Sequence, residues 1–333
     1  MKIYLAGDSI VQNYEKEEFI AGWGQFLPFF IKDGVEVVND AKGGRSSRLF
    51  INEGRFDNIE KNISAGDYLL IEFCHNDDAS KEYKTMFNRL TPLGEPDSDG
   101  RFPIIPGEAM PKDYIPPEYI DALRKDVNVK DKQAVLDSVY KILESYPHDT
   151  YYPYSADGSK GTYLWFLKQF VDMAREKGAV PVFVTAPART VYDANGNIKD
   201  GAGLHGGNNF AYIRAMKQLG EEAKVPVIDL FAYSCGLYKQ IGKEKIHWIT
   251  SIKKGCNKGI WPDDFNSEMQ KKETVSEDTH FNKYGAMLIT QGLVKLIKES
   301  DSSQLDGLKG MLKNPDGIDI EKYVKKPLVF EEF

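Results

Sequence analysis

Short apolar runs alternate with amphipathic helical patterns along most of this chain of 333 residues. The runs that we expect to form strands cover residues 2–6, 35–38, 67–73, 180–185 and 225–230. Helical patterns cover residues 22–32, 55–64, 162–177, 208–223 and 282–298. Strands that alternate with amphipathic helices indicate a parallel sheet with helices packed on both of its faces. The sequence therefore predicts an α/β protein.

Two long stretches interrupt this alternation. Residues 78–161 are rich in Pro, Gly and Asp, with one helical pattern near residues 132–144, and residues 235–276 form the second stretch. Both follow predicted strands, so they would lie near the carboxyl edge of the sheet, where α/β proteins form ligand sites. Stretches of this length are either functional additions or surface padding, and the sequence leaves both interpretations open. From residue 301 onward a charged, weakly patterned tail is expected to pack on the surface.

The charge and the cysteine content exclude several classes of protein. With 43 basic and 50 acidic side chains the net charge is −7, so no basic excess is present to neutralise nucleic-acid phosphates. No apolar run approaches the roughly 18–20 residues that span a bilayer, and we expect no membrane partner. Three scattered cysteines do not make a disulfide framework. These features favour a cytoplasmic protein, although a secreted chain whose leader had been removed would look the same.

Ser9 is a candidate nucleophile because it follows the first predicted strand, in Gly7-Asp8-Ser9-Ile10. A serine at such a turn points into the crevice at the sheet edge, but turn serines that only cap a helix are more common. The matching base would be His280, in Ser276-Glu277-Asp278-Thr279-His280 near the start of the last predicted helix. A carboxylate a few residues before a histidine can orient its ring, and a plain surface turn is the alternative.

Two further turns supply hydrogen-bond donors for a developing oxyanion. Gly43-Gly44-Arg45-Ser46-Ser47 follows the second predicted strand, and Cys74-His75-Asn76-Asp77 follows the third. The backbone N–H of Gly44 can approach an oxyanion closely, and the amide of Asn76 can donate as well. Three successive strand ends thus offer Ser, Gly and Asn, and a segment near the last helix offers His. This order favours one shared site over four unrelated turns.

In this arrangement the chain resembles the SGNH (GDSL-type) hydrolase superfamily, which is named after Ser, Gly, Asn and His in four separate blocks. The matching residues are Ser9, Gly44, Asn76 and His280. Further segments resemble rhamnogalacturonan acetylesterases of carbohydrate esterase family 12, namely Gly22-Trp23-Gly24, Val38-Asn39-Asp40-Ala41, Gly44-Arg45-Ser46-Ser47-Arg48, Glu53-Gly54-Arg55-Phe56-Asp57-Asn58-Ile59, Gly66-Asp67-Tyr68 and Glu72-Phe73. The resemblance is dense over residues 2–78, resumes over about 162–230 and returns at 277–298.

The resemblance implies a three-layer α/β/α sandwich of the flavodoxin-like type, around a parallel sheet of about five strands. A single hydrolase domain would cover residues 1–300, with insertions at about 78–161 and 235–276 and the tail at 301–333. The resemblance also implies a reaction that uses no cofactor and no metal ion.

Carried over to this sequence, the resemblance makes Ser9 the nucleophile and His280 the general base. The backbone N–H groups of Ser9 and Gly44 and the side chain of Asn76 would form the oxyanion hole. The family pattern places Asp three residues before the histidine, and this chain has Glu277 there, followed by Asp278. The spacing favours Glu277 as the triad acid, with Asp278 as the alternative.

The resemblance further implies an acetylated plant cell-wall oligosaccharide as substrate, hydrolysed through an acetyl-serine intermediate. A pectin-type substrate carries carboxylates, which arginines can pair with in bidentate fashion, and its sugar rings can stack on tryptophan. The candidate substrate-binding residues are Arg45, Arg48, Arg189, Trp23, His75 and Asp77. The alternative for the arginines is pairing with acidic neighbours inside the protein, and for Trp23 it is packing in the core.

Other functions fit the same residues. The chain could be an acetylxylan esterase or another carbohydrate esterase, or a thioesterase or lysophospholipase of the same superfamily. It could also be a carbohydrate-binding protein whose esterase site has decayed. Glu277 at the acid position favours decay slightly, whereas the intact set of Ser9, Gly44, Asn76 and His280 argues against it. The sequence leaves the oligomeric state open.

Overall fold

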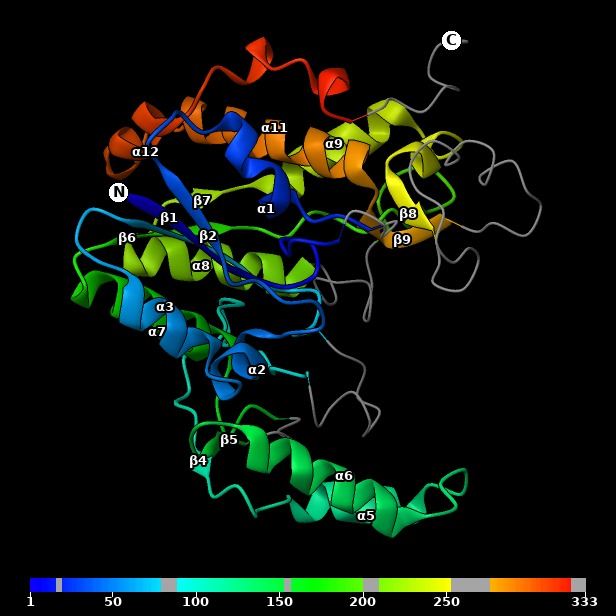
Figure 1. Ribbon diagram of the computed structural model, residues 1–333. Coiled ribbons are helices and arrows are strands. Elements are labelled where there is room, and N and C mark those ends of the chain that lie inside the picture. The colour runs from blue at the N-terminus through cyan, green and yellow to red at the C-terminus, as the bar shows by residue number, and fades with distance from the viewer. Residues whose placement is uncertain (16–19, 79–88, 153–156, 200–209, 253–275, 325–333) are drawn as a thin grey trace.

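A parallel sheet of five strands forms the centre of the computed structural model, which describes residues 1–15, 20–78, 89–152, 157–199, 210–252 and 276–324 (Figure 1). The strand order is β2 (Glu36–Asn39), β1 (Lys2–Gly7), β3 (Tyr68–Glu72), β6 (Val180–Val184) and β7 (Val227–Ile228). All neighbouring strands in this sheet are parallel. The predicted α/β class and the expected five-stranded sheet are therefore confirmed.

Helices cover both faces of this sheet, as Figure 1 shows. One layer contains α1 (Trp23–Phe26), which continues into the 3-10 helix η1 (Leu27–Phe30), with α9 (Leu230–Ile241) and α11 (Lys283–Glu299). The other layer contains α3 (Arg55–Asn62), α7 (Tyr163–Glu176) and α8 (Ala211–Ala223). Strand β1 is apolar on both sides because it contacts both layers: Ile3 and Leu5 belong to one core cluster, and Tyr4 and Ala6 to the other.

The first insertion contributes a pair of helices that projects from the sandwich (Figure 1). The pair consists of α5 (Pro117–Lys125) and α6 (Lys132–Ser145), next to the short antiparallel strands β4 (Ala109–Met110) and β5 (Thr150–Tyr151). A small separate core holds this helix pair, and Leu49 of α2 (Ser47–Asn52) takes part in it. The sequence predicted only α6. Helix α5 begins at a proline, which the first turn of a helix tolerates because its missing N–H would have no partner there.

The second irregular stretch begins later than the expected boundary at residue 235. Cys235 lies inside α9, whose buried residues Leu230, Ser234 and Tyr238 recur every four positions. The polar Ser234 interrupts the apolar period of this face, which is why the sequence pattern ended too early. Beyond α9 follow the 3-10 helix η3 (Ile246–Trp248) and β8 (Thr250–Ile252), which pairs antiparallel with β9 (Ser276–Phe281).

Residues 301–324 of the tail pack on the layer that contains α11 (Figure 1). This segment contains η4 (Ser303–Leu305), α12 (Asp306–Met311), η5 (Pro315–Gly317) and η6 (Ile320–Lys322). Leu305, Leu308, Leu312 and Ile320 are buried in the same core cluster as α11, so the segment adds apolar contacts to the domain. Among the helices in the described part of the chain, none is both long enough and apolar enough to cross a membrane.

Candidate active site

Ser9 and His280 meet at the carboxyl end of β1. The chain turns sharply after this strand, where the carbonyl of Asp8 accepts hydrogen bonds from the N–H groups of Val11 and Gln12 at 3.2 and 3.1 Å. Ser9 follows in this turn, and its Oγ lies 2.8 Å from Nε2 of His280. At this distance the imidazole can accept the serine proton, which is the arrangement that activates a serine nucleophile.

His280 lies near the end of strand β9, shortly before α11 begins. The pairing of β9 with β8 is irregular between Thr250 and Ile252, so β9 carries extra residues in a bulge. Bulges redirect side chains and are frequent beside active sites. Directly after β9, Asn282 caps α11 by accepting from the N–H of Gly285 at 2.9 Å. The strand, the bulge and the capped helix together determine where the imidazole ring lies.

The structure describes the side chain of only one of the two candidates for the triad acid. The side chain of Glu277 lies outside the described residues, so its role remains a prediction. The carboxylate of Asp278 accepts a hydrogen bond from the Thr279 hydroxyl at 2.9 Å and lies 3.8 Å from Nη1 of Arg189. Neither of these Asp278 contacts involves His280. These contacts of the Asp278 carboxylate are thus with Thr279 and Arg189. A triad acid must instead contact and orient the histidine.

The turn between β2 and α2 brings backbone N–H groups close to Ser9. Gly44 lies in this turn with a φ of +81°, which glycine adopts without strain. A β-carbon placed on Gly43 would lie 3.4 Å from Cβ of Ser9, so this turn passes directly beside the nucleophile. The backbone N–H groups of Ser9 and Gly44 have no hydrogen-bond acceptor among the described residues. They can therefore donate to a substrate oxygen.

Asn76, which follows β3, supplies a third donor. Its Nδ2 donates to Oδ2 of Asp8 at 3.0 Å, and both residues are buried. A side-chain amide has two N–H groups, so one of them remains for an oxyanion. The structure thus brings Ser9, Gly44, Asn76 and His280 together at one edge of the sheet.

Three carboxyl groups are buried behind these residues. Burial raises the pKa of Asp8 to about 6 and the pKa of Asp77 to about 7. Burial, together with the charges of Asp8 and Asp77, raises the pKa of Glu72 well above its ordinary value. These shifts favour the neutral, protonated form of each of the three carboxyl groups. This arrangement limits the negative charge next to a site that must stabilise an oxyanion.

Comparisons with known proteins identify the family. No protein-family model matches the sequence. The chain is 30% identical to the rhamnogalacturonan acetylesterase RhgT of Bacillus subtilis (strain 168) over 300 residues, which cover 90% of each chain. It is also 30% identical to the probable rhamnogalacturonan acetylesterase YesY of the same organism, over 89% of this chain and 92% of the relative. The chain belongs to the rhamnogalacturonan acetylesterase family.

A solved structure agrees with the fold of this rhamnogalacturonan acetylesterase family member. The crystal structure of protein YxiM from Bacillus subtilis superposes with a TM-score of 0.52 at 20% sequence identity. The superposition covers 91% of this chain and 57% of that one, so the chain spans just over half the length of YxiM. At this identity the likeness supports the shared fold and nothing more.

Four residues that the sequence predicted to bind substrate are buried in this family member, namely Trp23, Arg48, His75 and Asp77. Trp23 is fully buried in the core cluster that contains α11. Arg48 is 2% exposed, and its guanidinium donates to the carbonyl of Leu90 at 3.3 and 3.0 Å. Because a sugar cannot reach either side chain, these two assignments are corrected to packing roles.

His75 and Asp77 hold the site together from inside. Nε2 of His75 donates to the carbonyl of Pro187 at 2.9 Å, and burial lowers the pKa of His75 to about 3, so the ring is neutral. This bond ties the segment after β3 to the segment after β6. Oδ1 of Asp77 accepts from the backbone N–H and the hydroxyl of Ser47, at 2.9 and 2.5 Å. Both residues therefore position turns of the site and do not contact substrate.

Arg45 is accessible, but it is paired inside the protein. Its Nε and Nη2 donate to the two carboxylate oxygens of Glu53, each at 2.8 Å, and Nε of Arg55 donates to the same carboxylate at 3.0 Å. The structure therefore supports the alternative interpretation, in which these arginines pair with an acidic neighbour inside the protein. Arg189 similarly lies near Asp278.

Arg89 lies at the site, and the sequence analysis missed it. Its Nη2 would be 3.5 Å from a β-carbon placed on Gly44, so the guanidinium lies against the turn that supplies an oxyanion donor. Arg89 belongs to no helix or strand and to none of the family segments, so only the fold brings it to the site.

Within the described parts of the chain, no three His, Cys, Asp or Glu side chains are grouped so as to hold a metal ion.

Proposed function

We propose that the protein is a serine esterase that removes O-acetyl groups from rhamnogalacturonan- or pectin-type oligosaccharides. The observation that carries the proposal is the 2.8 Å contact between Oγ of Ser9 and Nε2 of His280. The donors of Gly44 and Asn76 lie beside it, as acyl transfer requires. Membership of the rhamnogalacturonan acetylesterase family supports the choice of substrate.

In the first half of the reaction, Oγ of Ser9 attacks the carbonyl carbon of the acetyl group while Nε2 of His280 takes the hydroxyl proton. The negative charge that forms on the carbonyl oxygen is stabilised by the N–H groups of Ser9 and Gly44 and by the amide of Asn76. Each such donor contributes about 2.7–4 kcal/mol in acyl transfer. The bond to the sugar oxygen then breaks, and His280 returns its proton to that oxygen, which leaves an acetyl group on Ser9.

In the second half, a water molecule replaces the sugar. His280 takes a proton from this water, whose oxygen attacks the acetyl carbonyl, and the same donors stabilise the second oxyanion. The bond to Oγ of Ser9 breaks and His280 returns the proton to the serine. One ester and one water are consumed, and one alcohol and one acetic acid are formed.

The nucleophile is tested by Ser9→Ala and His280→Ala. We expect each variant to lower the rate of acetate release from an aryl acetate by at least about 10³-fold, because the two groups act as a unit. The matched control is Ser138→Ala, on the exposed face of α6, which should retain the wild-type rate. A Ser9→Ala protein that still released acetate at the wild-type rate would end the proposal.

The substrate is tested with acetylated fragments of rhamnogalacturonan, pectin and xylan, together with a series of aryl esters of increasing acyl length. We expect acetate release to be fastest from rhamnogalacturonan or pectin fragments and to fall with acyl length. A preference for long acyl chains would point instead to a thioesterase or lysophospholipase. Retained sugar binding without turnover would indicate a carbohydrate-binding protein.

The proposal includes a cytoplasmic location, which cell fractionation tests.

A further inference from the structure

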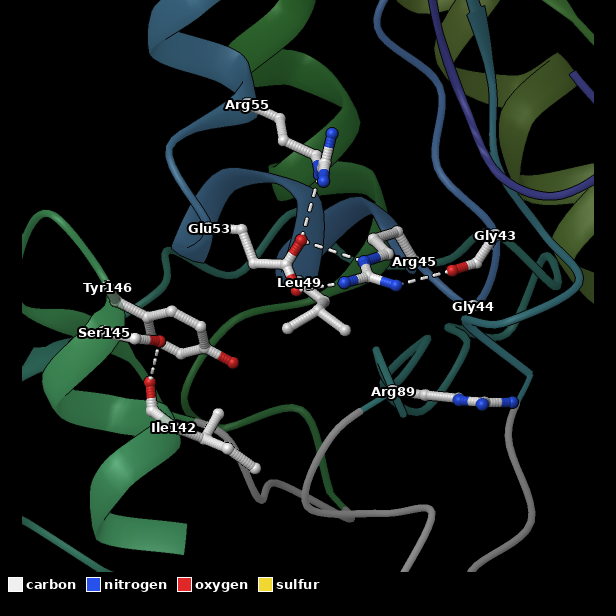
Figure 2. Close-up of a pocket in the computed structure, with 10 residues that line it drawn as sticks. All are labelled: Gly43, Gly44, Arg45, Leu49, Glu53, Arg55, Arg89, Ile142, Ser145 and Tyr146. Atoms are coloured by element: carbon white, nitrogen blue, oxygen red, sulfur yellow. Dashed lines mark hydrogen bonds and ion pairs between the residues drawn. The ribbon is translucent and has the colours of Figure 1, made fainter. Parts of the chain in front are cut away.

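A pocket of about 550 Å³ opens beside the oxyanion-hole turn. Its walls come from two parts of the chain that are far apart in sequence (Figure 2). The turn before α2 contributes Gly43, Gly44 and Arg45, and the end of α6 in the first insertion contributes Ile142, Ser145 and Tyr146. A pocket of this size suits one small ligand group, and Gly44 places it next to the reacting carbonyl.

Among the described residues that line this pocket, the charged ones are three arginines and one carboxylate. Glu53 is shared by Arg45 and Arg55, as the dashed lines of Figure 2 show, so its two oxygens already accept three N–H groups. Although burial opposes it, these hydrogen bonds hold the pKa of Glu53 below its ordinary value, so the carboxylate is charged. The described lining thus has one negative and three positive charges, so this part of the pocket wall is cationic.

Arg89 is the arginine of the pocket that Glu53 does not neutralise. Among the described residues, its guanidinium has no hydrogen bond and no ion pair, and Figure 2 shows it on the Gly44 side of the pocket. A planar guanidinium offers parallel N–H groups that match the two oxygens of a carboxylate. The nearness of Arg89 to Gly44 means that a carboxylate bound there would lie within about one sugar unit of the oxyanion hole.

We propose that this pocket is a carboxylate subsite, in which Arg89 binds the carboxylate of a uronate residue that neighbours the acetylated sugar. The inference rests on the proposed function and deepens it, because it assigns a substrate group to a named residue. It also gives the first insertion a role: Ile142, Ser145 and Tyr146 complete a wall that the sandwich alone does not have. The insertion reaches this position through the small core that it shares with Leu49 of α2.

The test compares two substrates that differ at their uronate carboxyl groups, which are charged in one and uncharged in the other. An acetylated rhamnogalacturonan oligosaccharide is used as it is and after its carboxyl groups have been converted to methyl esters. For wild-type protein we expect kcat/KM to be about 10- to 100-fold higher on the acidic form, the effect of a hydrogen-bonded charge pair. In Arg89→Gln this ratio should fall close to one, mainly through KM. The matched control, Arg124→Gln on the exposed side of α5, should keep the wild-type ratio.

Binding is measured in parallel, so that the subsite is tested without turnover. Calorimetry with Ser9→Ala protein and a galacturonate-containing oligosaccharide should show binding that the added Arg89→Gln change weakens about tenfold or more, and that added salt also weakens. If wild-type protein releases acetate but Arg89→Gln changes neither the substrate ratio nor the binding, the subsite is wrong and the esterase stands. If binding depends on Arg89 but no oligosaccharide is deacetylated, the subsite stands and the esterase proposal fails. Absence of both binding and turnover overturns both.

Discussion

Asn76 donates a hydrogen bond from Nδ2 to Oδ2 of Asp8 over 3.0 Å, and Asp8 is the residue directly before the nucleophile Ser9. The other oxygen of the same carboxylate accepts from the N–H of Ile10 at 2.9 Å. One buried carboxylate therefore holds both the turn that presents Ser9 and the amide that would face an oxyanion. Asp8 acts through these groups, so it is a positioning residue.

This relationship predicts unequal effects at the two positions. Asn76→Ala removes an oxyanion donor, and we expect kcat to fall by about 10²- to 10³-fold. Asp8→Asn keeps the shape but replaces one accepting oxygen by an amide nitrogen, so either the Asn76 amide or the Ile10 N–H loses its acceptor. We expect a smaller fall in kcat, of about tenfold, with little change in KM. Steady-state kinetics on an aryl acetate measure both effects.

The control for this pair is Asn128→Ala, at an exposed turn of the first insertion, which should leave the kinetics unchanged. A wild-type kcat for Asp8→Asn would show that the carboxylate does not position the amide. A wild-type kcat for Asn76→Ala would remove Asn76 from the oxyanion hole.

Gly44 and Gly34 offer a matched pair that separates catalysis from stability. Both have left-handed φ angles, +81° and +85°, so alanine at either position should cost about 1–2 kcal/mol of the free energy of unfolding. No atom lies within 4 Å of a β-carbon on Gly34, whereas a β-carbon on Gly44 would contact Arg89. We expect Gly44→Ala alone to lower kcat, by about tenfold or more, because the backbone N–H at the oxyanion hole shifts. Urea denaturation and kinetics measure the two effects; equal kcat values in the two variants would contradict this role.

The sheet and its helices could be predicted because their signal is local. Apolar residues recur at strand or helix spacing wherever an element packs on the sheet, as in α7, whose buried residues include Leu164, Leu167 and Val171. The site residues Ser9, Gly44 and Asn76 were found because each follows a strand of a parallel sheet. The carboxyl ends of such strands meet at one edge, so their order in the sequence predicts their meeting in space.

Burial of individual polar and aromatic residues could not be predicted from local sequence. The sequence left Trp23 open between stacking on a sugar and packing in the core, and the structure shows core packing: a β-carbon on Gly22 or Gly24 would overlap the carbonyl oxygens of Gln12 and Val11. The glycines allow close backbone contact, and the tryptophan between them fills the core. Such contacts join positions that are distant in sequence, and no short pattern reveals them.

The roles of the individual arginines could not be predicted from local sequence for the same reason. Arg48 is buried and donates to a carbonyl 42 positions away, at Leu90, and Arg89 reaches Gly44 from the early part of the first irregular stretch. Whether an arginine pairs internally or faces a ligand depends on such partners. The sequence predicted arginines for an acidic substrate, and the fold decides which arginines are paired inside the protein.

The identity of the triad acid is tested by Glu277→Gln and Asp278→Asn. The Asp278 carboxylate is engaged by Thr279 and lies near Arg189, so we expect Asp278→Asn to change kcat less than about threefold. We expect Glu277→Gln to lower kcat by about 10²- to 10⁴-fold, because an amide cannot stabilise the imidazolium of His280. Each variant removes one negative charge, so each serves as the control for the other. The opposite order of effects would make Asp278 the acid, and two wild-type rates would mean that the histidine works without either carboxylate.

The buried carboxyl groups predict how stability depends on pH. Burial raises the folded-state pKa of Asp77 to about 7, whereas an unfolded aspartate titrates near 3.9. Between about pH 4 and pH 7 the folded protein therefore holds a proton that the unfolded chain releases. This contribution to stability is complete below about pH 4 and is lost as pH rises through 7, with a slope of at most about 1.4 kcal/mol per pH unit.

Asp77→Asn removes this titration and keeps an oxygen for the two hydrogen bonds from Ser47. We expect the free energy of unfolding of the variant, relative to wild type, to rise as pH increases from 4 to 7. Urea denaturation at several pH values across this window measures the difference. Asp137→Asn, on the exposed side of α6, is the matched control and should follow the wild-type curve at every pH. Parallel curves for Asp77→Asn and wild type would show that Asp77 has the same pKa in the folded protein as in the unfolded chain, and would contradict this prediction.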